Sequence, residues 1–156
     1  MRRRIAAVLC VAASLGLLCA QDAVQRLQDV KKVYVGSFGD GPGSELIRSK
    51  VISRLVKSNR VEVVEVPDQA DAILTGVGEL SKTTYYNANA TSTNANASGG
   101  TRYNATAGAR LLNKQQKILW ADEASTGFFY RSASSSVADK IVKNLLKAMS
   151  QGGKKK

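Results

Sequence analysis

Hydrophobic and polar residues follow two patterns along this chain, short apolar runs and a helical repeat. The change from one pattern to the other marks the predicted elements. Residues 33–38 and 61–66 are short runs rich in valine that end at turn-forming residues, a pattern typical of strands. Between these runs, apolar residues recur every three or four positions, which predicts an amphipathic helix with Ser44 as its N-cap and Asn59 near its end. A strand, a helix and a strand in this order predict a crossover unit.

Three further strands are predicted after this unit. Residues 72–80 form the third strand. Residues 102–112 and 117–129 form the fourth and fifth, joined by a tight turn at residues 113–116. Residues 85–100, before the fourth strand, are a low-complexity run of asparagine, alanine, threonine and serine with too little apolar area for a core. We therefore expect a long, mobile hairpin tip there.

The end of the chain carries the clearest helical pattern. Apolar residues from Val137 to Met149 fall on one stripe, Ser136 and Asp139 have the spacing of a capping box, and Gly152 is a suitable stop. The whole pattern predicts an α+β fold. It is a two-layer sandwich, with two amphipathic helices on one face of a mixed, mostly antiparallel sheet of about five strands with a long hairpin.

The first twenty residues predict export. A basic start, an apolar run too short to span a bilayer and an end suited to cleavage after Ala20 predict a signal peptide over residues 1–20. Residues 21–151 then form a single α+β domain and residues 152–156 a basic tail, in a protein that is periplasmic or secreted. Lipidation of Cys19, which would make an outer-membrane lipoprotein, is the alternative, although the two leucines before this cysteine make a poor lipobox.

The chain is strongly basic, with 23 Lys and Arg residues against 12 Asp and Glu and a net charge of +11. In an exported protein this charge favours an envelope protein or an anionic envelope polymer or lipid as partner, and not a nucleic acid. No segment after the predicted leader has the length and apolarity of a membrane span, so any contact with a membrane is expected to be peripheral. Self-association into a homo-oligomer stays open.

The residue inventory argues against catalysis. The chain has no histidine, and Cys10 and Cys19 both lie in the predicted leader, which excludes Ser-His-Asp catalysis, thiol catalysis and the usual zinc sites from the domain. Asp122 and Glu123 are adjacent on a predicted strand, so their side chains leave opposite faces and cannot act as a pair. Asp71 lies near a turn, where capping or solvation explains it. We predict no catalytic, cofactor-binding or metal-binding residue.

A glycine-rich turn at residues 39–43 precedes the first predicted helix, where a phosphate loop would lie. Its spacing fits neither the dinucleotide-binding pattern nor a Walker loop. A flexible connection into the helix explains these glycines. An anion site at the turn is the alternative.

Two sets of residues are candidate contacts. Tyrosine is favoured at interfaces, so tyrosines and asparagines near the polar hairpin are candidate partner contacts. These are Tyr85, Tyr86, Asn87, Asn89 and Tyr103. The basic stripe of the first helix, Lys50, Arg54 and Lys57, is the candidate anionic contact. Packing at a sheet edge and a solvated helix face are the respective alternatives, and Trp120 is expected in the core.

Several phrases of the chain, in their order, resemble those of small bacterial envelope proteins. They are LVKSNRVEVV at residues 55–64, ADAILTG at residues 70–76, KILWA at residues 117–121, and the closing helix. The nearest groups are the LptE-like lipopolysaccharide-assembly lipoproteins and the CsgG-like group of curli-transport proteins and penicillin-binding-protein activators. The resemblance covers residues 33–149 and implies helices against a mixed sheet and a role in binding an envelope partner. Residues 85–100 depart from it, being too polar for the lipid-facing hairpin of a curli-type pore.

These observations predict a non-enzymatic exported envelope protein that binds an outer-membrane, cell-wall or assembly component through its hairpin and sheet edge. Two alternatives stay open: an enzyme or carrier for an anionic envelope molecule, and a subunit of a secretion ring. A deep pocket with converging polar groups would favour the enzyme or carrier, whereas a protruding hairpin without a pocket would favour the binding module.

Overall fold

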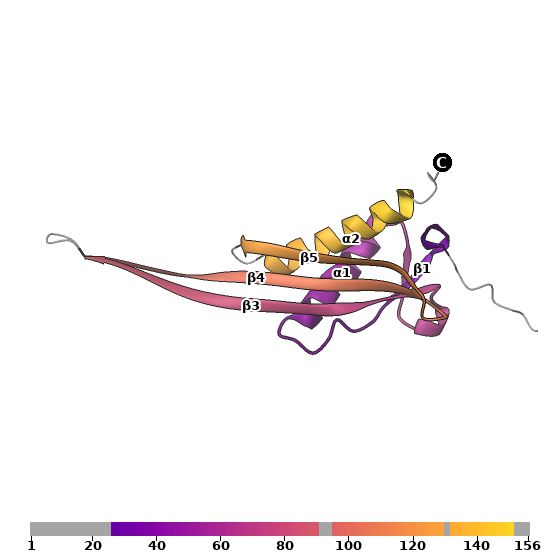
Figure 1. Ribbon diagram of the computed structural model, residues 1–156, viewed down its shortest axis with the longest axis horizontal. Helices are drawn as coiled ribbons and strands as arrows, with labels where there is room; N and C mark the ends of the chain where they lie inside the picture. The colour runs from indigo at the N-terminus through magenta and orange to yellow at the C-terminus, as the bar shows by residue number, and fades with distance from the viewer. Residues whose placement is uncertain (1–25, 91–94, 130–131, 152–156) are drawn as a thin grey trace, which may run out of the picture.

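Both helices lie on one face of a five-stranded sheet in the computed structural model, which describes residues 26–90, 95–129 and 132–151 (Figure 1). The strands are β1 (Lys32–Val35), β2 (Glu62–Val64), β3 (Ala72–Ala90), β4 (Ala95–Asn113) and β5 (Ile118–Phe129). The helices are α1 (Ser44–Ser58) and α2 (Ala133–Gln151), with short 3-10 turns at η1 (Leu27–Asp29) and η2 (Pro67–Gln69). This arrangement confirms the predicted α+β fold.

The sheet is mixed, in the order β2-β1-β3-β4-β5. The short strand β1 pairs in parallel with β2 on one side and with β3 on the other. The long strands β3, β4 and β5 form an antiparallel meander. Because β1 and β2 are parallel neighbours joined by α1, the predicted crossover unit is confirmed.

The N-cap of helix α1 lies one residue before the predicted position. Gly43, with φ of 79°, occupies the N-cap position, and Ser44 is the first helical residue and is buried, so its assignment as N-cap is wrong. The predicted end is confirmed, because Asn59 adopts a left-handed conformation with φ of 53° and donates its backbone N–H to the Val56 carbonyl. Asparagine is among the few residues that tolerate this conformation.

The core lies between the sheet and the two helices. Its largest fully buried side chains come from both helices, from β3 and β4, and from the segment after β1: Phe38, Ile47, Leu55, Leu74, Leu111, Ile141 and Leu145. Alanines 105, 107 and 109 of β4 are buried, and such small side chains let α2 approach the sheet closely. Trp120 is half-buried and packs against this core, as predicted.

Helix α2 starts at Ala133, earlier than its stripe indicates. The Ser136 backbone N–H donates to the Ser132 carbonyl at 2.9 Å, so Ser136 lies inside the helix and the predicted capping box is wrong. The apolar stripe is confirmed, since Val137, Ile141 and Leu145 are fully buried. Gly152 lies outside the described residues. Within the described part of the chain, neither helix combines the length and the apolarity that a membrane span requires.

Strands β3 and β4 pair in one unbroken register from Ala72 opposite Asn113 to Ala90 opposite Ala95. The prediction of a mobile tip over residues 85–100 is therefore wrong for most of that segment, which is strand. The predicted turn at residues 113–116 is confirmed, because the buried Asn113 side chain accepts backbone hydrogen bonds from Gln115 at 3.0 Å and Lys117 at 2.9 Å.

Candidate functional site

The hairpin of β3 and β4 extends well past the body of the protein (Figure 1). The last described pairing of β5 is Phe129 with Tyr103, which also lies opposite Lys82. Beyond this point, and within the described residues, β3 and β4 pair only with each other. We call residues 83–90 and 95–102 the distal hairpin. At about 3.4 Å per residue, its strands project by roughly 25 Å.

Tyrosine–glycine pairs support the distal hairpin. Tyr85 lies opposite Gly100 and Tyr86 opposite Gly99. A Cβ atom on Gly100 would lie 2.6 Å from the Tyr85 hydroxyl oxygen, and one on Gly99 would lie 3.0 Å from Cδ1 of Tyr86. Each ring therefore lies over a glycine, an arrangement that supports strand pairing where glycine alone would weaken it. The Arg102 guanidinium adds a cation–π contact, 4.4 Å from the centre of the Tyr85 ring.

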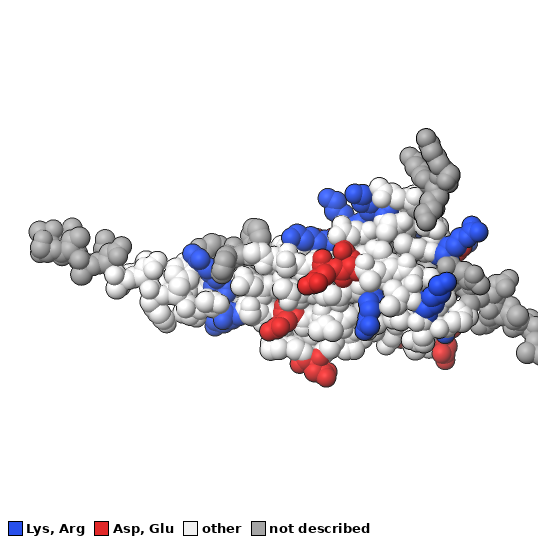
Figure 2. Space-filling model, in the orientation of Figure 1, with Lys and Arg blue, Asp and Glu red and all other residues white. Residues whose placement is uncertain are grey.

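The distal hairpin has no charged side chain between Lys82 and Arg102. Figure 2 shows this directly: the hairpin is white beyond a basic group near its base, whereas the body carries charges of both signs. Strand edges in natural proteins are usually protected by lysine, proline or bulges. The distal hairpin has none of these devices along its described strands, where its ladder is continuous.

The predicted set of partner contacts does not form one surface. Tyr85 and Asn87 lie on one face of the hairpin, and Tyr86, 83% exposed, lies on the other, because successive residues of a strand alternate between faces. Asn89 is the ladder partner of Asn96, farther along β3. Tyr103 lies at the hairpin base, opposite Lys82. The set therefore divides into two hairpin faces and a separate basal position.

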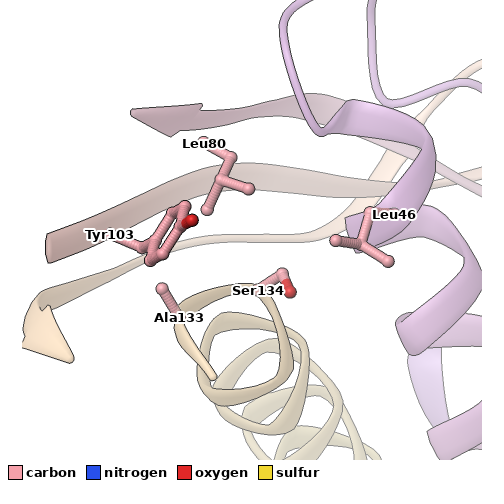
Figure 3. A pocket seen from close by; sticks show the side chains of 5 residues that line it. All are labelled: Leu46, Leu80, Tyr103, Ala133 and Ser134. Carbon is pink, nitrogen blue, oxygen red and sulfur yellow. The ribbon is translucent and has the colours of Figure 1, made fainter. Parts of the chain in front are cut away.

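Tyr103 lines a small pocket of about 220 Å³ at the hairpin base. Its other lining residues come from the first turns of both helices and from β3: Leu46, Leu80, Ala133 and Ser134. Figure 3 shows the Tyr103 hydroxyl turned towards the pocket from beside Leu80, and Ser134 at the start of α2 between Tyr103 and Leu46. Sequence reasoning missed this pocket. The one available signal was Leu46, 45% exposed, an apolar residue outside the buried stripe of α1.

The glycine-rich segment before α1 is tied to β3, in contrast to the predicted flexible connection. Backbone N–H groups of three β3 residues donate to it: Gly76 to Ser37 at 3.1 Å, Gly78 to Phe38 at 2.7 Å and Leu80 to Pro42 at 2.7 Å. Glycine is needed where this segment touches β3, because a Cβ atom on Gly43 would lie 2.5 Å from that of Leu80. We call residues 37–43 the glycine strap. These contacts explain its glycines without a bound anion.

The three residues of the predicted anionic contact have different environments. Arg54 forms an ion pair with Asp139 of α2, so this guanidinium joins the two helices. Lys50 is half-buried and Lys57 is exposed. The alternative of a fully solvated basic face is wrong for Arg54, because α2 packs beside α1 and brings the Asp139 carboxylate to it.

The acidic residues serve the fold. The Asp71 carboxylate accepts the backbone N–H groups of Lys31 at 2.9 Å and Lys32 at 2.8 Å, which fixes the start of β1 beside β3 and confirms its capping role. Asp122 accepts a hydrogen bond of 2.7 Å from the Asn144 side chain of α2, so it faces the helices, opposite to its neighbour Glu123. No cluster of three metal-binding side chains occurs among the described residues.

No protein-family model matches the chain, and no curated protein matches it significantly. Among solved structures, it is similar to a dodecameric PelC variant from Paraburkholderia phytofirmans, with 15% identity, TM-score 0.47 and coverage of 76% of this chain and 85% of that one. It is also similar to a PDZ domain protein from Parabacteroides distasonis, with 14% identity, TM-score 0.44 and coverage of 81% and 33%. A third likeness is to a neuraminyllactose-binding hemagglutinin homologue from Helicobacter pylori, with 11% identity, TM-score 0.42 and coverage of 78% of each chain.

Likeness at this level identifies neither a family nor a ligand. The resemblance to LptE-like and CsgG-like envelope proteins therefore stays a prediction.

Proposed function

We propose that this protein is a non-enzymatic envelope protein that binds an outer-membrane, cell-wall or assembly component through its distal hairpin. The observation that carries this proposal is the two-stranded ladder that continues past the body of the fold and has no charged residue between Lys82 and Arg102. The predicted signal peptide supports an envelope location, and the structural use of Asp71 and Asp122 supports a role other than catalysis.

Binding to a partner explains the presence of the distal hairpin better than stabilisation of the fold does. A two-stranded ladder without a third strand or a covering helix is marginally stable in water. Among the side chains that the structure describes, none from the distal hairpin belongs to the buried core, whose members on β4 end at Ala105. Its outer edges offer backbone N–H and C=O groups to another strand, and its exposed Tyr86 offers an aromatic contact.

The direct test replaces residues 87–98 with an Asn-Gly turn. This cut joins Tyr86 to Gly99, which are ladder partners, so a two-residue turn closes the shortened hairpin in its natural register. We expect the variant to fold and melt like the parent and to capture less of the partner from an envelope extract. Thermal melting and quantitative pull-down should be measured on the same preparation.

Lys57→Ala is the matched control, since it removes an exposed charge from α1 and leaves the hairpin intact. It should capture as much partner as the parent. The proposal fails if the shortened hairpin retains full capture. Loss of capture in Lys57→Ala alone would place the contact on the helix face.

A ring subunit is a second candidate, favoured by the same open hairpin edges, because β3 of one copy could pair with β4 of the next. This candidate requires self-association of the purified protein. Light scattering across a concentration series would detect it, and a monomer at every concentration would reject it. The shortened hairpin should dissociate any oligomer that forms in this way.

A further inference from the structure

The pocket at the hairpin base combines apolar walls with a buried polar group. Leu46, Leu80 and Ala133 supply the apolar part. Ser134 is only 7% exposed, lines the pocket, and has no hydrogen-bond partner for its hydroxyl among the described residues. Because Ser134 lines the pocket and its hydroxyl is bonded to no described residue, this hydroxyl is available to a ligand that enters the pocket. The Tyr103 hydroxyl faces the same space (Figure 3).

The first turn of α2 adds a preference for negative charge. The Ser136 N–H reaches the Ser132 carbonyl, so the N–H groups of residues 133–135 precede the helical hydrogen-bond ladder. These groups lie at the positive end of the α2 dipole, beside Ala133 and Ser134 in the pocket wall.

Two lysines near the pocket residues add positive charge to that of the α2 N-terminus. Lys50 follows Leu46 by one helical turn, on the same side of α1. Lys82 is the ladder partner of Tyr103, so the two side chains leave the same face of the hairpin. Glu45 is the acidic residue next to Leu46, and its carboxylate pairs with Arg48 at 3.4 Å.

We propose that this pocket binds a small aliphatic carboxylate. The carboxylate would accept hydrogen bonds from the Ser134 and Tyr103 hydroxyls at the start of α2, and the aliphatic part would lie against Leu46 and Leu80. A volume of about 220 Å³ suits a short chain or one branched side chain. This site is independent of the function proposed for the distal hairpin.

Titration of the purified protein with octanoate tests the assignment, with methyl NMR signals of Leu46, Leu80 and Ala133 as the readout. Octanamide has the same chain without the charge and should bind about tenfold more weakly, because hydrogen bonds to a charged group are the stronger kind. N-acetyl-leucine carries the same chemistry as the end of a peptide chain. Tighter binding of N-acetyl-leucine than of octanoate identifies a peptide terminus as the source, and the reverse order identifies a free acid.

Two variants make the test specific. Leu46→Trp fills the pocket mouth from an exposed position and should abolish the octanoate shifts, whereas Val77→Trp, 65% exposed on β3 and outside the pocket, should leave them unchanged. Ser134→Ala combined with Tyr103→Phe should weaken octanoate about tenfold and octanamide less. The proposal is overturned if octanoate moves none of the three methyl signals, if octanamide binds equally well, or if Leu46→Trp binds like the parent. The shortened hairpin should keep octanoate binding.

Discussion

Glycines in this chain have different physical roles, which the structure separates. Gly43 combines a φ of 79° with a Cβ position 2.5 Å from the Leu80 Cβ atom, so both its backbone conformation and its packing require glycine. Gly108 has neither constraint, since nothing lies within 4 Å of its Cβ position and its φ is not positive. The sequence alone does not show that glycine is required at position 43 and not at position 108.

Gly43→Ala should therefore destabilise the protein. The left-handed backbone costs about 1–2 kcal/mol for a residue with a side chain, and overpacking against Leu80 adds about 1–3 kcal/mol. Gly108→Ala is the matched control and should leave stability unchanged or raise it by up to about 1 kcal/mol. Urea unfolding measures both. Equal losses in the two variants would contradict the role assigned to the glycine strap.

Asp71 should be a stabilising residue because one carboxylate oxygen accepts two backbone N–H groups at the start of β1. Asp71→Ala leaves both donors without this acceptor and should cost about 1–3 kcal/mol. Asp71→Asn keeps a neutral acceptor oxygen and should cost less. Denaturant unfolding compares the free energy of unfolding of the two variants. An equal loss in Asp71→Asn and Asp71→Ala would show that the acceptor oxygen does not stabilise the start of β1.

At single positions, the sequence predicts roles that depend on local geometry and misses those that depend on distant partners. Asn59 and the turn at Asn113 follow from nearby backbone geometry and were predictable. The pairing of Arg54 with Asp139 was not predictable, because the two residues are 85 positions apart in the chain. Ser134 gave no signal either, since only the packing of both helices against the hairpin base places it beside Leu46.

At the level of elements, burial decides what a pattern can predict. Both helices and the inner part of every strand have one buried face, which imposes a period on their apolar residues, and this period is visible in the sequence. The distal hairpin has no core face, so no period marks it. Its strands follow from cross-strand pairs such as Tyr85 with Gly100 and from the continued register of β3 and β4. Neither can be recognised before the pairing is known.

The docking of α2 is a testable property of this element. Leu145 is fully buried in the core, so Leu145→Ala should cost about 2–5 kcal/mol through lost burial and the cavity left behind. Leu46→Ala makes the same chemical change at a site that is 45% exposed and should cost much less. Thermal or urea unfolding compares them. A Leu145→Ala variant as stable as Leu46→Ala would mean that α2 is not docked as described.

At the scale of the whole molecule, the distal hairpin and the two ends of the described chain lie at opposite ends of the long axis. Figure 1 shows η1, where the described chain begins, at the end of the body opposite the distal hairpin. The C-terminal end of α2 lies at that same end (Figure 1). An attachment through the N-terminal segment would therefore leave the distal hairpin pointing away from the point of attachment.

Site-specific immobilisation tests this polarity. The only cysteines, Cys10 and Cys19, lie in the predicted leader, so a cysteine introduced into the protein without its leader is a unique point for biotin. Gln28→Cys lies in η1 and Ala88→Cys in the distal hairpin, and both positions are exposed. Coupled through Gln28→Cys, the protein should capture its envelope partner as well as it does free in solution, because the distal hairpin remains accessible. Coupled through Ala88→Cys, it should capture much less, since the support then covers the proposed contact. Equal capture from both orientations would remove the distal hairpin as the contact surface, and selective loss through Gln28→Cys would move that surface to the opposite end of the molecule.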